Sequence, residues 1–203
     1  MLHDSNVANI EAYQNFLKII EENTLIKEID DNKMEYYINY YMDMRNFQLN
    51  FAWAIPSEYA INEIIKFSRK DKVLEIGSGL GLWCHLLQLN GLDIIGTDNF
   101  SSHTQKEKER FCKIEEISAI DATNKYIDRN VLMTIWPPMS SMVSDALKIF
   151  KGNKLIYIGE PEGGCTGDES FFDILEKYWV KIDIIKISQW RGICDGLHIY
   201  LKK

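Results

Sequence analysis

Three glycines set between two acids form the part of this sequence best suited to chemistry. The stretch VLEIGSGLG carries Glu75 in an apolar run, followed by Gly77, Gly79 and Gly81. Glycine adopts positive φ readily and, having no Cβ, lets a ligand approach the backbone. The start of a following helix offers free N–H groups and a positive dipole end, which suit a carboxylate or phosphate. Asp98 lies seventeen residues after Gly81, where a carboxylate can accept hydrogen bonds from ribose hydroxyls.

The elements that would position this turn are indicated by the chain after Asp71. Short apolar runs alternate there with helical patterns, which indicates parallel strands joined by helices around a shared sheet. The predicted parallel strands are 72–76, 93–97, 117–120, 131–136 and 154–159. The predicted helices are about 80–90, 139–150 and 169–179. Two last strands, about 181–188 and 197–202, are separated by about eight residues, too few for a crossover helix, so we expect an antiparallel pair.

The first 70 residues are predicted to be helical. Two amphipathic runs lie on either side of a polar break at 28–32, and their apolar residues are Ile10, Tyr13, Leu17 and Ile20, then Met34, Tyr37, Ile38, Tyr41 and Met44. Pro56 and Ser57 begin a third helix that ends near Ser68, since proline suits a first helical turn. Asp168 is predicted to cap the helix that follows it. We therefore divide the chain into an N-terminal helical extension, 1–50, and a cofactor-binding domain, 51–203.

Two classes of cofactor-binding protein use such a glycine turn. Dinucleotide-binding domains need G-x-G-x-x-G, and Leu82 stands at the sixth position, so that motif does not fit. The spacing Glu-x-Gly-x-Gly-x-Gly closely resembles the first motif of class I S-adenosylmethionine-dependent methyltransferases. An antiparallel last pair of strands is also typical of that family. The resemblance implies an α/β fold: a Rossmann-like sandwich with a seven-stranded, mostly parallel sheet in the order 3-2-1-4-5-7-6.

The same resemblance implies S-adenosylmethionine as the cofactor and assigns residues to it. The glycine loop would pass beneath the methionine portion, and Asp98 would hold the ribose. Asp121 and Ala122 look like the acidic loop that contacts adenine in these enzymes, the Asp accepting from the amino group and the adjacent N–H reaching a ring nitrogen. A helix cap formed by Asp121 is an equally weighted alternative. The predicted cofactor-binding residues are Glu75, Gly77, Ser78, Gly79, Gly81, Asp98, Asp121 and Ala122.

The methyl acceptor is expected beyond the fourth strand, at the sequence WPPM. Trp136 begins this sequence, where the family's fourth motif faces the transferred methyl. Amine methyltransferases often carry Asn or Asp before the two prolines, so Trp136 weakens a prediction of DNA-adenine or glutamine methylation. The Trp136 carbonyl can still accept a hydrogen bond. Trp136 either lines the acceptor pocket, which we favour slightly, or packs in the core.

The loop after the fifth strand and two flanking segments complete the candidate acceptor site. Glu160 stands at the strand end, and we predict that it accepts a proton or orients the acceptor. Trp53 either forms a lid near the sulfonium, through a cation–π contact, or is a buried anchor. Trp190 and Asp195 either hold the substrate loop or, as we favour, stabilise the last turn. The predicted catalytic residues are Glu160 and Trp136, and the predicted substrate-binding residues are Trp53, Trp136, Pro137, Glu160 and Gly164.

Composition limits the classes of function. The 203 residues include 46% hydrophobic and 26% charged residues and no membrane-spanning run, which is typical of a soluble globular protein. A formal net charge of −7 disfavours a nucleic-acid acceptor, although neither a nucleic-acid nor a protein acceptor is excluded. The four cysteines form no C-x-x-C pair and the four histidines no zinc-ligand spacing. We therefore expect reduced thiols, a cytoplasmic location and no metal.

These observations predict an S-adenosylmethionine-dependent methyltransferase whose unidentified acceptor is expected to be a small molecule. The set WPP, GGCTGD and W-x-G-x-x-D also resembles a group of uncharacterised methyltransferase-like proteins, which supports the fold and cofactor and supplies no substrate. Displacement at a sulfonium needs alignment more than a strong base, so no His–Asp or Cys–His pair is required. The alternative is a non-catalytic S-adenosylmethionine-binding partner or regulatory subunit, which Trp136 keeps open. An oxidoreductase is disfavoured by Leu82, and the oligomeric state is left open.

Overall fold

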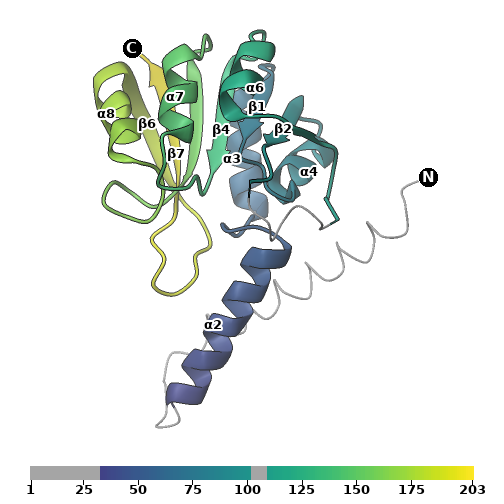
Figure 1. The fold of residues 1–203 in the computed structure, drawn as a ribbon, viewed down its shortest axis with the longest axis vertical. Coiled ribbons are helices and arrows are strands. Elements are labelled where there is room, and N and C mark those ends of the chain that lie inside the picture. Colours follow the sequence, from purple (N-terminus) through teal and green to yellow (C-terminus); the bar gives the residue numbers. More distant parts are fainter. Residues whose placement is uncertain (1–32, 102–108) are drawn as a thin grey trace, which may run out of the picture. The chain divides into compact units, whose positions relative to one another are not determined.

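The computed structural model describes residues 33–101 and 109–203, and its fold is drawn in Figure 1. The chain forms two compact units, Met1–Phe51 and Ala52–Lys203, and each is described by itself. In the first unit, helix α2 spans Lys33–Asn50 and includes the second run predicted to be helical. Two residues expected on its apolar face, Ile38 and Tyr41, are exposed. The run from 10 to 20 and the break at 28–32 lie outside the described residues.

The second unit is built on one seven-stranded sheet. The strands are β1 (Val73–Ile76), β2 (Ile94–Asp98), β3 (Ile114–Glu116), β4 (Val131–Ile135), β5 (Lys154–Gly159), β6 (Trp179–Lys186) and β7 (Gly196–Lys202). They lie in the order β3-β2-β1-β4-β5-β7-β6. β1 to β5 run parallel, and β7 is antiparallel to both β5 and β6. The predicted fold class, a mostly parallel sheet that ends in an antiparallel pair, is therefore confirmed.

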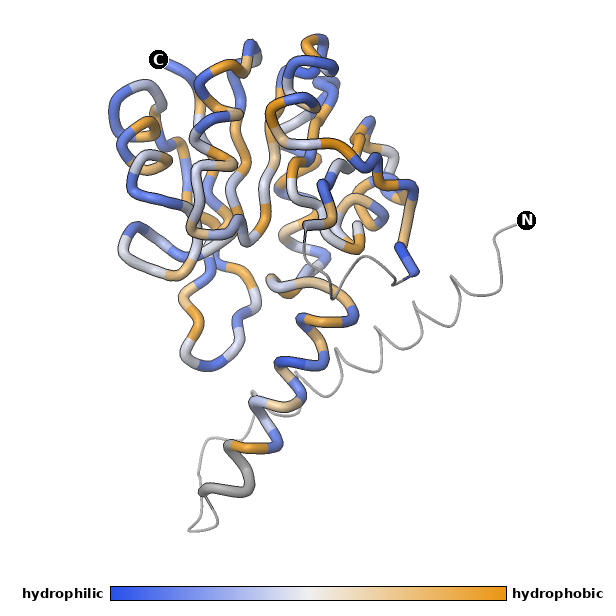
Figure 2. Tube along the Cα trace, viewed as in Figure 1, coloured by the Kyte–Doolittle hydropathy of each residue, from blue (hydrophilic) through white to orange (hydrophobic). Residues whose placement is uncertain are grey.

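Helices cover both faces of this sheet, which makes the unit a three-layer sandwich (Figure 1). α3 (Glu58–Ser68) and α4 (Leu82–Leu89) bury apolar side chains against one face. α6 (Ala119–Lys125), α7 (Met142–Ile149) and α8 (Glu169–Tyr178) pack on the other. Both faces of the central strands are covered, so these strands are mostly apolar, as Figure 2 shows, and Glu75 in β1 is a buried charged exception.

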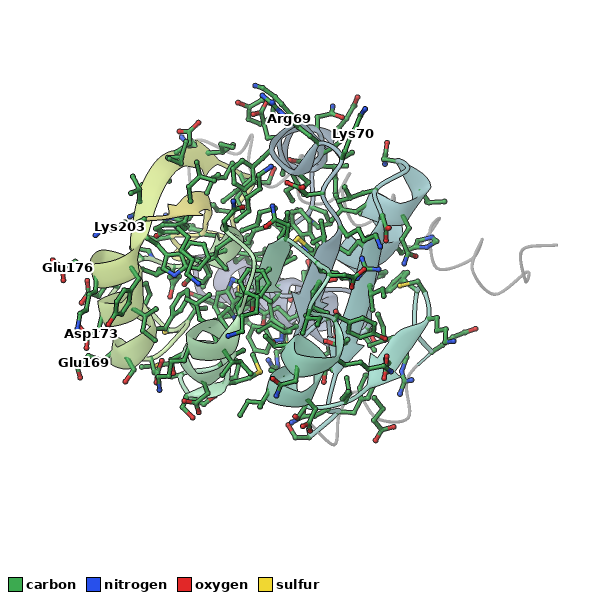
Figure 3. The ribbon with its side chains drawn as sticks, turned by 90° about the horizontal axis from the view of Figure 1, so that it is seen from above. Arg69, Lys70, Glu169, Asp173, Glu176 and Lys203 are labelled. Carbon is green, nitrogen blue, oxygen red and sulfur yellow. The ribbon has the colours of Figure 1, made fainter. Side chains whose placement is uncertain are left out.

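Helix α8 illustrates how sequence pattern places a helix on the sheet. Phe171 and Leu175, four residues apart, are buried in the core below it. Its acidic residues point outward, as Figure 3 shows for Glu169, Asp173 and Glu176. The Asp168 carboxylate accepts a hydrogen bond from Phe171 N at 3.0 Å, so the predicted cap is confirmed.

The third helix also begins where the sequence indicates. The hydroxyl of Ser57 accepts a hydrogen bond from Ala60 N at 3.2 Å, and α3 continues from Glu58 to Ser68. A polar cap of this kind satisfies one of the backbone N–H groups that the first turn leaves without a partner. The helix predicted after Pro56 is therefore confirmed at both ends.

The predicted third strand, 117–120, is wrong. The strand is β3 at Ile114–Glu116, and residues 119–125 form helix α6. The hydroxyl of Ser118 accepts a hydrogen bond from Asp121 N at 3.1 Å and caps α6, so strand pairing ends before it. Ile114, in turn, fills the space above Gly96, where an added Cβ would lie 2.5 Å from its Cδ1. Packing on the neighbouring strand therefore decides the register.

Candidate functional site

The glycine turn joins β1 to α4, and its backbone conformation requires glycine. Gly77, Gly79 and Gly81 all have positive φ, at 72°, 55° and 80°. At Gly81 a Cβ would also lie 2.6 Å from Ile114 Cδ1, so this residue admits no side chain. Gly81 is the N-cap of α4 and supplies no capping side chain. The first turn of α4 is thus without a side-chain cap at its N-cap position, where a ligand carboxylate can accept from backbone N–H groups.

Asp98 is joined directly to the glycine turn. Its Oδ2 accepts a hydrogen bond from Gly79 N at 2.8 Å, and its Oδ1 accepts one from Phe100 N at 2.7 Å. The side chain is half-buried at the end of β2, beside the end of β1. A carboxylate has about four lone-pair positions. Asp98 can therefore fix the loop and still accept hydrogen bonds from a ligand hydroxyl.

Ser78 and Glu75 support the turn from below. The Ser78 hydroxyl accepts a hydrogen bond from Thr97 N at 3.0 Å, which ties the loop to β2. Glu75 is only 1% exposed, and its Oε2 has no hydrogen-bond partner among the residues that the structure describes. Burial raises the pKa of the Glu75 carboxyl to about 8; the Asp98 charge adds to this rise, and a hydrogen bond from Ser78 opposes it. The acid of the motif is thus a buried carboxyl beneath the turn.

Asp121 and Ala122 lie in the first turn of α6 and not in an open loop. Ser118 is the capping residue, and its hydroxyl donates to the Asp121 carboxylate at 2.7 Å. Asp121 is exposed, so its carboxylate is reachable from solvent. Ala122 is buried in the core, and its N–H donates to the Ser118 carbonyl at 2.8 Å. The helix therefore already uses the Ala122 amide, and of this pair only Asp121 presents polar atoms outward.

Trp136 follows β4 in a backbone conformation that is rare for a large side chain. Its φ is +49°, and its N–H donates to the Ile158 carbonyl at 2.7 Å. Its ring stacks on Trp53 with centroids 5.1 Å apart and planes 20° apart, and both rings are half-buried. The structure thus brings together the two tryptophans predicted to bind substrate. We call Trp53 and Trp136 the indole pair.

Glu160 connects two loops at the carboxyl end of β5. Its Oε2 accepts a hydrogen bond from Cys165 N at 2.7 Å, and its Oε1 accepts one from Cys194 N at 3.1 Å. Gly164 packs against it, since a Cβ there would lie 2.5 Å from the Glu160 Cβ. Pro137, from the other predicted segment, accepts a hydrogen bond from Gly167 N at 3.1 Å through its carbonyl. The segments predicted to border the acceptor pocket are therefore hydrogen-bonded to each other.

Asp195 makes a contact with Trp136 that the sequence did not indicate. It is 2% exposed, and its Oδ1 accepts a hydrogen bond from the Trp136 indole N–H at 2.7 Å. Burial raises the pKa of the Asp195 carboxyl to about 7; the Trp136 hydrogen bond opposes this rise, and the Glu160 charge adds to it. A buried acid with a perturbed pKa is a candidate for a functional role. No spacing signal could have paired it with Trp136, because the two residues lie 59 positions apart.

Within 33–101 and 109–203, no three or more His, Cys, Asp or Glu side chains are grouped as metal ligands. Cys84, Cys112, Cys165 and Cys194 are all free thiols, as expected. In the same described part of the chain, no helix is both long and apolar enough to span a membrane.

The comparisons with known proteins rest on structure. No family model and no curated protein sequence matches the chain. Magnesium protoporphyrin IX methyltransferase from Synechocystis PCC 6803, solved with bound S-adenosylmethionine, is 10% identical with a TM-score of 0.51, over 87% of this chain and 99% of that one. Burkholderia thailandensis 1,6-didemethyltoxoflavin-N1-methyltransferase is 11% identical with a TM-score of 0.52, over 83% and 86%. A protein from Pyrococcus horikoshii OT3 is 15% identical with a TM-score of 0.50, over 90% and 99%. At these identities the likeness shows the fold, which is that of methyltransferases.

Proposed function

We propose that this chain binds S-adenosylmethionine at the glycine turn and transfers its methyl group to a small-molecule acceptor. The observation that carries the proposal is the hydrogen bond from Gly79 N to Asp98. It places the carboxylate that we propose to bind the ribose directly beside the glycine turn. Two structures of the same fold, crystallised with S-adenosylmethionine or S-adenosylhomocysteine, support the choice of cofactor.

The donor set fits this cofactor. The half-buried Asp98 carboxylate offers acceptors for the ribose hydroxyls, and the first turn of α4 offers N–H groups for the methionine carboxylate. Asp121, exposed in α6, offers acceptors for the adenine amino group. When bound, the cofactor supplies an electrophilic methyl on a positively charged sulfur, and the protein has to align the acceptor with it.

On the acceptor side, we propose a pocket bordered by the indole pair, Pro137, Glu160 and Gly164. Both Glu160 oxygens already accept backbone hydrogen bonds from the two bordering loops. In this proposal Glu160 therefore orients the acceptor by holding these loops, which is one of the two roles expected for it. Trp136 excludes water from the reacting centre. Small-molecule methyl acceptors are named for the two methyltransferases of similar fold, which is the class that we propose here.

Calorimetric titration with S-adenosylhomocysteine tests the cofactor assignment. Asp98→Ala removes an ionised acceptor and should lower the affinity about ten- to hundredfold, since a hydrogen bond to a charged group contributes about 1.5–3 kcal/mol. Asp173→Ala is the matched control, because Asp173 is exposed on α8 (Figure 3) and should bind as the parent does. Equal affinities for all three proteins would reject the site. Transfer of a labelled methyl group into fractionated metabolites then separates an enzyme from a non-catalytic binding partner, which would bind without transfer.

A further inference from the structure

The Asp195 carboxyl is buried and only partly satisfied, and the cofactor assignment makes no use of it. Oδ1 accepts a hydrogen bond from the Trp136 indole N–H, and Oδ2 has no hydrogen-bond partner within the described part of the chain. The main-chain carbonyl of Asp195 accepts a hydrogen bond from the Gln189 side chain, which fixes the turn around it. A buried polar atom without a partner destabilises the fold. A carboxyl buried with one oxygen unsatisfied is a candidate for a role beyond folding.

The residue that Asp195 holds is itself strained. A φ of +49° at Trp136 brings its Cβ close to a carbonyl oxygen, which is unfavourable for a residue other than glycine. Three contacts maintain this conformation: the bond to the Ile158 carbonyl, the stack on Trp53 and the indole bond to Asp195. Strained backbone that its surroundings hold in place is concentrated at functional sites. The result is a large flat ring, half-buried and fixed in direction, at the carboxyl end of β4.

We propose that Asp195 is a positioning residue that fixes Trp136 as the aromatic wall of the acceptor pocket, so that the preferred methyl acceptor has a flat aromatic ring. This inference rests on the proposed function and adds the chemical class of the acceptor to it. Flat rings pack on an indole by offset stacking or edge contacts, which add to the affinity gained from buried apolar area. The preference requires that the indole keep one orientation, and the Asp195 bond provides this.

Ionisation of Asp195 makes this role measurable. With its pKa raised to about 7 by burial, the carboxyl is charged above neutral pH and protonated below it. The groups that face it are Glu160 after β5, whose charge favours the protonated form, the Tyr157 phenol of β5, and the Trp136 indole N–H, which favours the charged form. A hydrogen bond to a charged acceptor is roughly twice as strong as one to a neutral acceptor. The indole is therefore held more firmly above neutral pH than below it.

The first experiment follows the indole N–H resonance of Trp136 in the full chain labelled with ¹⁵N-tryptophan and assigned with Trp136→Phe. Between about pH 5.5 and about pH 8.5 the resonance should shift with a midpoint near neutrality, which a group of ordinary Asp pKa cannot produce. Asp195→Asn should abolish this titration, and the control Asp173→Asn should preserve it. A Trp136 resonance with the same position and the same pH dependence in Asp195→Asn as in the parent protein overturns the proposal.

The second experiment tests the aromatic wall in protein saturated with S-adenosylhomocysteine, at about pH 8. The probes are 2-naphthol, which is flat, and its saturated counterpart decahydro-2-naphthol. We expect 2-naphthol to shift the Trp136 resonance and to bind about fivefold more tightly than the saturated probe, with the preference lost in Asp195→Asn. Equal binding of the two probes overturns the proposal. Failure of the parent protein to bind S-adenosylhomocysteine rejects the proposed function instead, and the pH titration, which needs no ligand, tells the two failures apart.

Discussion

Replacing Glu75 with glutamine should remove much of the pH dependence of folding stability. The side chain is 1% exposed beneath the glycine turn, and burial raises the pKa of its carboxyl from 4.5 to about 8. Below about pH 4.5 the carboxyl is protonated in both the folded and the unfolded chain, so ionisation costs nothing. As the pH rises from about 4.5 to about 8, the unfolded chain releases this proton while the folded chain retains it. The free energy of unfolding therefore falls over this range and levels off above it.

The size of the effect follows from the same difference. At 1.36 kcal/mol per pKa unit, the rise from 4.5 to about 8 corresponds to a loss of roughly 5 kcal/mol, fully developed above pH 8. This is a ceiling, because relaxation and water entry lower the cost of a buried charge. Glutamine has nearly the same shape but cannot ionise. A glutamine amide without hydrogen-bond partners lowers the free energy of unfolding by about 1–3 kcal/mol at every pH. The informative quantity is therefore the change in the free energy of unfolding with pH.

The assay is urea unfolding of the parent and of Glu75→Gln at about pH 5, 6.5 and 8.5. The parent should lose several kcal/mol from the lowest to the highest pH, and Glu75→Gln should lose markedly less. Asp195, which is also raised in pKa, contributes equally to both proteins and cancels in the comparison. The control is Glu116→Gln, an exposed acid at the end of β3, whose slope should match the parent's. Parallel slopes for the parent and Glu75→Gln would refute the reasoning.

Two further predictions concern the turn and the acceptor side. Gly81→Ala should lower the free energy of unfolding by about 1–3 kcal/mol and weaken S-adenosylhomocysteine binding, because it combines a positive φ with a Cβ placed 2.6 Å from Ile114 Cδ1. Gly91→Ala is the control, because Gly91 has a φ of +82° but no described atom lies within 4 Å of an added Cβ, so urea unfolding should show only the backbone strain. An equal loss of stability in the two variants would show that the contact with Ile114 contributes nothing. Glu160→Gln should slow methyl transfer in single-turnover experiments and leave cofactor affinity nearly unchanged, once an acceptor is identified. An unchanged rate would leave Glu160 with a structural role only.

The sequence alone predicted most of the strands and the backbone conformation of the glycine turn, because both depend on local patterns. Continuous apolar runs mark strands that are buried on both faces, and the short link before β7 leaves only an antiparallel pairing. The glycines of 77–81 need positive φ whatever surrounds them, so their spacing can be interpreted without tertiary information. The cap at Asp168 is equally local. The boundary of β3 was the exception, because there the packing of Ile114 over Gly96 and the cap at Ser118 decided the pairing.

Only the tertiary structure decided how the acceptor side is built. The hydrogen bond between Trp136 and Asp195 spans 59 residues, and that between Glu160 and Cys194 spans 34, so no periodicity relates the partners. The sequence assigns Trp136 and Glu160 to one candidate acceptor site and leaves two roles for Asp195, holding the substrate loop or, as favoured, stabilising the last turn. The pKa of that carboxyl, and the strain at Trp136, arise from burial and contacts that exist only when β4, β5 and β7 are adjacent. Chemistry that depends on such contacts belongs to the folded chain and cannot be derived from residue types and spacing.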